Sequence, residues 1–68
     1  DLDFTLTSRQ TQIMQHLSRG LDPQTIAVLL GSQEDTINNT IRRILKKMSV
    51  TDTGSAVLRA VSCGLIEP

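Results

Sequence analysis

The feature that most constrains this chain is a stripe of apolar residues in its second half. The stripe consists of Ile37, Ile41, Ile44, Leu45 and Met48. Its members recur at intervals of three, four and seven residues, the spacing that places side chains on one face of an α-helix. The positions on the opposite face are polar or charged. The pattern therefore predicts an amphipathic helix over residues 33–48 that buries one face and exposes the other.

A first helix is expected over residues 8–19. Thr7 and Gln10 fit a capping box, in which the Thr hydroxyl accepts from the third helical amide and the Gln side chain reaches back. Gly20 is a natural left-handed terminator. Met14 falls on the apolar face of this helix, so we expect it to fill the core rather than bind a ligand, as we do for the methionine that ends the stripe.

A second helix is expected over residues 23–30. Asp22 supplies a capping carboxylate, and Pro23 occupies the first helical position, where its missing amide hydrogen costs nothing. Gly31 would end this helix, and Ser32 with the acids that follow it predicts a capped start for the next one. Two helices joined closely around a glycine are typical of a helix-turn-helix motif.

A fourth helix is expected over residues 54–63, closed by Gly64. No segment alternates with the two-residue period of a strand. We therefore predict an all-α, four-helix helix-turn-helix bundle in which the first and fourth helices support the second, and the second supports the third. Because the chain starts at Asp1 rather than Met, we expect a piece of a longer protein, with residues 1–5 as a linker remnant and 6–68 as the domain.

Composition narrows the classes of function. The chain of 68 residues has seven Lys plus Arg and seven Asp plus Glu, so any affinity for nucleic acid must come from local clustering. One Phe and no Trp or Tyr leave little for bases to stack on, which argues against single-stranded nucleic acid. No nucleophile–base pair, metal cluster or phosphate loop is visible, so we expect neither an enzyme nor a cofactor. No apolar run approaches the roughly 20 residues of a membrane span.

Isolated residues with chemical potential are given ordinary structural roles. His16 has no second His or Cys at ligand spacing, so we expect a surface histidine and no metal site. Cys63 has no partner for a disulfide, which fits a cytoplasmic setting, and we expect it to be a small packed residue near a helix end.

The third expected helix carries the strongest functional signal. Its polar face holds Asn38, Asn39, Arg42, Arg43, Lys46 and Lys47, with no acid between Thr36 and Val50. Lys and Arg on consecutive turns of one helix form a local electrostatic footprint for DNA phosphates. Asn can bond bidentately to adenine in the major groove. We therefore predict that residues 33–47 form a recognition helix for duplex DNA.

The chain resembles the LuxR/FixJ-type (GerE-like) C-terminal DNA-binding domain over nearly its whole length. The resemblance is carried by Leu6-Thr7-Ser8-Arg9, Gly20-Leu21, Ile26-Ala27, Leu30-Gly31, Thr36-Ile37, Ile44-Leu45-Lys46-Lys47-Met48, Val50 and Gly64-Leu65-Ile66. It implies the output domain of a bacterial transcription regulator, of the response-regulator or quorum-sensing kind. It also implies base reading by Asn38, Asn39 and Arg42, and a dimer on DNA formed through the fourth helix. Ala56, Arg59 and Cys63 are the expected dimer contacts, and RNA polymerase is a further candidate partner.

The chain also departs from that family. Gln24, Asn38 and Thr53 stand where the family usually has basic residues, and each lost phosphate contact lowers affinity for DNA. Val28 and Leu29 are apolar where such domains usually expose polar groups. They indicate either extra core or a protein contact. The alternative function is therefore a degenerate helix-turn-helix that serves as a protein-interaction module with weak or no DNA binding.

Overall fold

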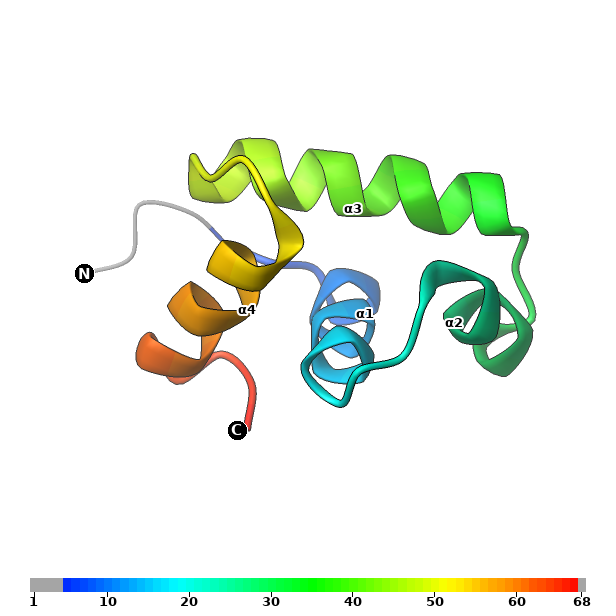
Figure 1. The fold of residues 1–68 in the computed structure, drawn as a ribbon, viewed down its shortest axis with the longest axis horizontal. Coiled ribbons are helices and arrows are strands. Elements are labelled where there is room, and N and C mark those ends of the chain that lie inside the picture. Colours follow the sequence, from blue (N-terminus) through cyan, green and yellow to red (C-terminus); the bar gives the residue numbers. More distant parts are fainter. Residues whose placement is uncertain (1–4, 68) are drawn as a thin grey trace.

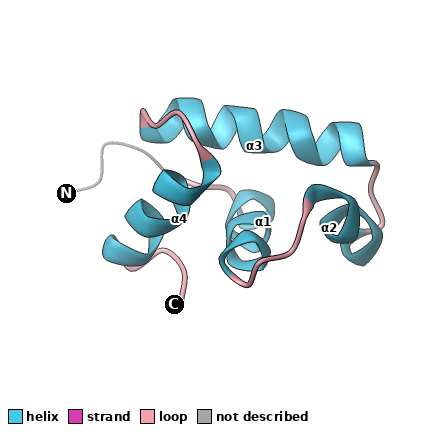
Figure 2. Cartoon of the chain, viewed as in Figure 1, coloured by secondary structure: helices cyan, strands magenta, loops and turns pink. Residues whose placement is uncertain are grey.

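The computed structural model describes residues 5–67, which form four helices. They are α1 (Ser8–Ser18), α2 (Pro23–Leu30), α3 (Glu34–Met48) and α4 (Thr53–Ser62). No strand occurs in this part of the chain (Figure 2), so the predicted all-α class is confirmed. The longest helix, α3, runs along one side of the molecule, and the other three lie beneath it (Figure 1). The predicted linker falls mostly outside the described residues and stays a prediction.

The first helix begins at the predicted capping box. The Thr7 hydroxyl accepts a hydrogen bond from the Gln10 amide at 3.1 Å, and the Thr7 amide donates to Gln10 Oε1 at 3.1 Å. The carboxylate of Asp22 caps α2 by accepting from the Thr25 amide at 2.8 Å, with Pro23 in the first turn. Side-chain caps satisfy amides that the helix itself leaves without partners, so these starts are fixed locally.

The turn between α2 and α3 is tight because it contains a glycine. Gly31 adopts the left-handed conformation, with φ of 65° and ψ of 35°, which a residue with a Cβ adopts at a cost. The amide of Ser32 then donates back to the Ala27 carbonyl at 2.8 Å. This bond closes α2. Only Ser32 and Gln33 lie between Gly31 and the first residue of α3, so the connection is as short as a helix-turn-helix requires.

The predicted side-chain cap of α3 is wrong. Gln33, not Ser32, is the N-cap residue, and no side-chain hydrogen bond caps this helix. The reason is that Ser32 belongs to the turn that closes α2. The acids Glu34 and Asp35 in the first turn instead favour this end electrostatically, since the N-terminus of a helix carries partial positive charge.

One apolar core lies between α3 and the helices beneath it. Its buried hydrophobic residues are Ile13, Met14, Ile26, Ala27, Ile37, Ile41, Ile44, Met48, Ala56, Ala60 and Ile66. The predicted core roles of Met14 and Met48 are confirmed. Within the described residues α3 packs against all three other helices, whereas α4 contacts α1 and α3 but not α2. The prediction that the fourth helix supports the second is therefore wrong, and α3 itself joins these two ends of the domain.

Two predictions about single side chains fail. Cys63 is exposed, because the chain turns at Gly64 and brings Ile66 back over the core in its place. His16 is half-buried rather than on the surface, since it lies one turn after Ile13 and therefore beside the buried face of α1. Its Nδ1 atom is buried and has no hydrogen-bond partner within the described chain.

Candidate nucleic-acid interface

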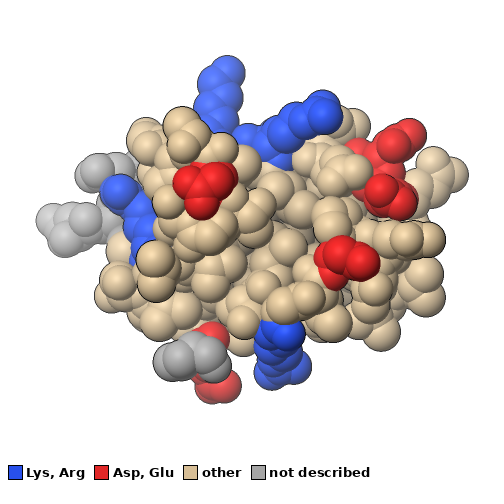
Figure 3. Space-filling model, in the orientation of Figure 1, with Lys and Arg blue, Asp and Glu red and all other residues tan. Residues whose placement is uncertain are grey.

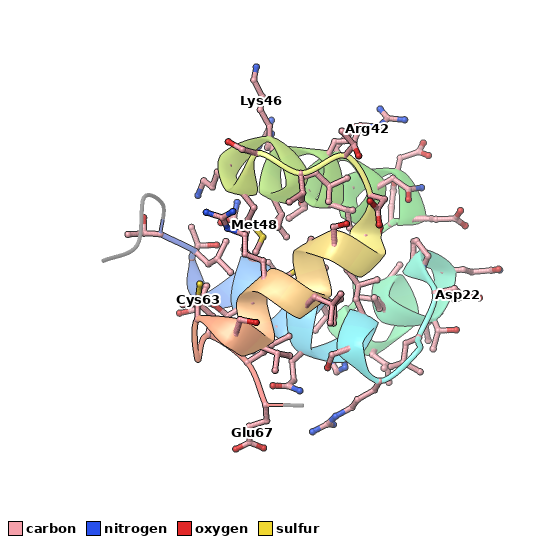
Figure 4. All side chains as sticks on the ribbon, turned by 60° about the vertical axis from the view of Figure 1, so that its left-hand side comes forward. Asp22, Arg42, Lys46, Met48, Cys63 and Glu67 are labelled. Atoms are coloured by element: carbon pink, nitrogen blue, oxygen red, sulfur yellow. The ribbon has the colours of Figure 1, made fainter. Side chains whose placement is uncertain are left out.

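The outward face of α3 carries a cluster of polar and basic side chains opposite the core. We define this outward cluster as Asn39, Arg42, Arg43 and Lys46, all of which are exposed. Arg42, Arg43 and Lys46 follow Asn39 by three, four and seven residues, so the four side chains share one face of the helix. Figure 4 shows Arg42 and Lys46 pointing away from the body of the domain, whereas Met48 points inward. The structure therefore brings together four of the six residues predicted to bind DNA.

The cations of the outward cluster form no ion pair with any residue between 5 and 67. Arg42 Nη1 donates a long hydrogen bond of 3.4 Å to Asn39 Oδ1. Arg43 and Lys46 make neither a hydrogen bond nor an ion pair with any other residue between 5 and 67. Because charged donors without protein partners are hydrated and accessible, they can bind an anion without first breaking a contact.

Charge is distributed unevenly along α3. Glu34 and Asp35 lie in its first turn, and Lys46 and Lys47 lie in its last. Figure 3 shows the same separation, with Lys and Arg projecting from the edge formed by α3 and acidic side chains at the end where the helix begins. The positive surface is therefore confined to the second half of the helix, where it also complements the negative end of the helix dipole.

Asn38 and Asn39 differ in their surroundings. Asn39 is exposed and belongs to the outward cluster, whereas Asn38 is half-buried on the flank of the helix. The sequence pattern does not distinguish these two residues. It also does not show directly that exposed Asp35 lies one turn before Asn39 on the same face of α3. The four-residue spacing between Asp35 and Asn39 is the signal that could have placed this acid beside the outward cluster.

Lys47 lies beside the outward cluster, but its ammonium is hydrogen-bonded to other parts of the protein. Its ammonium donates to Gln10 Oε1 at 2.9 Å and to the Thr5 carbonyl at 3.1 Å. With Arg43 and Lys46 it lines an open hollow of about 460 Å³ between the start of α1 and the second half of α3, with Gln10 as the fourth lining residue. Of the six predicted residues it is thus the one with two hydrogen bonds inside the domain.

The predicted dimer contacts on α4 separate into two groups. Ala56 is 0% exposed and packs in the core, so its side chain offers no surface to a second copy, and this part of the prediction is wrong. Arg59 and Cys63 are exposed. Sequence reasoning missed Leu58, which is 71% exposed on the same helix. A leucine inside an otherwise apolar helix gave no sign of which face it would take.

The exposed apolar residues of α2 settle one alternative. Val28 is 78% exposed and Leu29 is 58% exposed, so neither adds to the core. Of the two sequence-based interpretations, only the protein contact is left for this pair.

The remaining titratable residues form no site. Hydrogen bonds from the Thr25 and Ser55 amides lower the pKa values of Asp22 and Asp52, which are helix caps. Between residues 5 and 67, His, Cys, Asp and Glu gather nowhere in a group of three or more that could hold a metal. No helix in this part of the chain is long and apolar enough to cross a membrane.

Comparison with known proteins agrees with this geometry. A family model described as bacterial regulatory proteins, luxR family, matches residues 4–60. The solved structure of the transcription factor GerE superimposes with a TM-score of 0.88 at 29% sequence identity, covering 91% of this chain and 92% of GerE. Both the fold and the order of its elements are therefore those of a known regulatory domain.

Two curated relatives are full-length regulators. The transcriptional regulatory protein YxjL of Bacillus subtilis, itself described as uncharacterized, is 31% identical over 67 residues, which is 98% of this chain and 31% of YxjL. The transcriptional regulatory protein DegU of Brevibacillus brevis is 31% identical over 62 residues, which is 91% of this chain and 26% of DegU. The chain thus spans about a third or less of the length of these relatives.

Proposed function

Because the chain belongs to the luxR family of bacterial regulatory proteins, we propose that it binds duplex DNA sequence-specifically, with α3 in the major groove, as the output domain of a transcription regulator. The family is one of DNA-binding regulatory domains rather than enzymes, so no chemical step is assigned to the chain. A regulator that acts on a bacterial promoter works in the cytoplasm, and that is where we place it.

The single observation that carries this proposal is the outward cluster on α3. A helix of 15 residues is about 22 Å long, and the major groove, about 12 Å wide, admits such a helix. The buried face of α3 rests on the other three helices, so its outward face can enter the groove without any helix moving. Arg42, Arg43 and Lys46 then supply phosphate or base contacts, and Asn39 supplies an amide for base reading.

Asn38 has a subordinate place in this interface. Its half-buried flank position keeps it beside the groove wall while Asn39 faces the bases. We assign it to the interface as a neighbour of the outward cluster rather than as the principal reader.

The second part of the proposal is a homodimer on DNA. The side chains Leu58, Arg59 and Cys63 on or next to α4 are exposed and supply a surface for a second copy. Two copies related by a two-fold axis would read half-sites about one DNA turn apart or a multiple of it, because operator symmetry mirrors protein symmetry. RNA polymerase is the further partner that regulation of a promoter entails.

A titration of duplex DNA at several salt concentrations tests the proposal. If Arg42, Arg43 and Lys46 each contact one phosphate, the expected slope of log affinity against log salt is about −2.7 per copy, at about 0.9 per phosphate contact. Arg42→Ala should weaken binding to every sequence and reduce that slope by about 0.9. Undetectable binding at low salt, with the helical circular-dichroism spectrum intact, would refute the proposal.

A second candidate function rests on the exposure of Val28 and Leu29. In this reading α2 docks a partner protein, and the domain has lost DNA binding. The discriminating experiment replaces both residues by Ser in a longer form of the regulator. Loss of a partner in pull-down, together with no DNA binding by the unaltered protein, favours the interaction module. Unchanged DNA affinity in the double variant favours the DNA-binding function.

A further inference from the structure

Lys47 makes contacts that set it apart from the other cations of α3. Its ammonium lies 2.9 Å from Gln10 Oε1 and 3.1 Å from the Thr5 carbonyl oxygen, and both distances are ordinary for N–H···O hydrogen bonds. These two acceptors belong to α1 and to the segment that leads into it, 37 and 42 residues away in the sequence. Lysine 47 therefore joins the last turn of α3 to the beginning of the domain.

The acceptor on α1 is itself held in place. Gln10 is only 8% exposed, and the same Oε1 atom accepts from the Thr7 amide at 3.1 Å. The backbone amide of Gln10 in turn donates to the Thr7 hydroxyl at 3.1 Å. One buried amide oxygen thus serves the capping box of α1 and the ammonium of α3 together. Its position is set by the helix cap, so it orients the lysine rather than following it.

We infer that Lys47 is a positioning residue, which fastens the chain entering α1 to the last turn of α3, and that it does not bind a DNA phosphate. The inference rests on the proposed function of α3 as the reader of DNA and divides its cations into two groups. Arg43 and Lys46 have no hydrogen bond or ion pair between residues 5 and 67 and are free to meet phosphate. To reach a phosphate instead, Lys47 would have to give up two bonds inside the domain.

The two hydrogen bonds of Lys47 also affect the segment that leads into α1. Because the Thr5 carbonyl is one of the two acceptors, the position of Thr5 is set relative to the last turn of α3. A pull that moves Thr5 away removes one bond from the ammonium and weakens the contact between α1 and α3. The two hydrogen bonds of Lys47 therefore couple the position of Thr5 to that of α3.

The test compares Lys47→Met with Lys46→Met in the 68-residue chain. Both variants keep an unbranched side chain and lose one ammonium, but of the two lysines only Lys47 has hydrogen-bond partners between residues 5 and 67. Titration with a mixed-sequence duplex should show that Lys46→Met reduces the salt slope by about 0.9 and that Lys47→Met leaves it unchanged. In urea unfolding, Lys47→Met should raise the unfolded-to-folded ratio at least about two- to tenfold, which is the net value of one of the two hydrogen bonds that it removes.

Two further readouts keep the inference testable if Lys47→Met folds poorly. Gln10→Glu replaces the acceptor by a carboxylate. It should lower the unfolded-to-folded ratio by up to about fivefold when Lys47 is present, but not in the Lys47→Met background. In NMR spectra of the free protein, Lys47→Met should shift the backbone amide of Thr7, whereas Lys46→Met should not. A slope that falls equally in both variants would overturn the inference, and so would a Gln10→Glu effect that is independent of Lys47.

The proposed function can fail separately. If the unaltered chain binds no duplex at low salt, the proposed function is refuted. The unfolding and NMR results still decide whether Lys47 ties α3 to the entering chain.

Discussion

Asn39 is the side chain on which sequence recognition by this domain most depends. It is exposed on the outward face of α3, between the basic side chains and the acidic first turn. An Asn amide bound bidentately to adenine contributes about 1–3 kcal/mol of discrimination against the wrong base. That corresponds to roughly 5- to 150-fold in relative affinity. Asn39→Ala should therefore lose that preference.

The free protein opposes this base contact only weakly. The Asn39 Oδ1 atom accepts from Arg42 Nη1 at 3.4 Å, beyond the 2.9–3.0 Å that is most common for such bonds. Since the bond is long and exposed, replacing it by contacts to DNA costs little. The discrimination should thus approach the upper part of its range rather than be consumed by breaking an internal contact.

The assay is selection from a pool of random duplexes, followed by competition titrations with the selected site and with single-base variants. Asn39→Ala should lose discrimination at one position of the site and keep the salt slope, because the amide is neutral. Asn38→Ala is the comparison variant: the same side chain lies half-buried one residue earlier, and its loss should reduce discrimination less than Asn39→Ala does. If Asn39→Ala selects the same site as the unaltered protein with the same discrimination, α3 does not read bases through this residue.

Three further predictions concern stability. Ile44→Ala, at a 0% exposed site, should lower the free energy of unfolding by about 2–5 kcal/mol, whereas Val28→Ala, at a 78% exposed site, should change it by less than about 0.5 kcal/mol; equal effects in urea unfolding would contradict the core described above. Hydrogen bonds from first-turn amides lower the pKa values of Asp22 and Asp52, so their contribution is present above about pH 4 and is lost as pH falls below it; replacing both by Asn should flatten that loss while keeping the caps. Ser49 has a φ of 57°, so Ser49→Gly should raise the thermal midpoint, and a lower midpoint would show that the hydroxyl matters more than the backbone.

Much of this fold could be predicted from the sequence because its signals are local. The Thr7 capping box, the Asp22–Pro23 start and the glycine turn at Gly31 each involve residues within five positions of one another. The periodic stripe of α3 identified its buried face for the same reason. Such features depend on backbone geometry alone, so the surroundings cannot change them much.

The features that could not be predicted depend on contacts between distant segments. The partner of Lys47 is 37 residues away, and periodicity places this lysine on the polar face without saying whether water, DNA or Gln10 lies beside it. Likewise, Ala56 in α4 and Cys63 at its C-cap belong to one apolar stretch, and the packing of α4 against α1 and α3 decides that Ala56 is covered and Cys63 is exposed. Sequence pattern therefore gave the helix and its two faces, and packing decided how the polar face is divided.

The neutral total charge makes the oligomeric state decisive for affinity. The three cations of the outward cluster give three phosphate contacts per copy. Affinity should then fall about 40-fold between 50 and 200 mM salt for one copy, and about 2,000-fold for two copies bound together. Measuring the slope on a duplex with one half-site and on a duplex with two half-sites separates these cases. A slope near −5.4 on the double site would support paired binding. A slope near −2.7 on both duplexes would mean that each copy binds alone, and α4 would then have no part in DNA recognition.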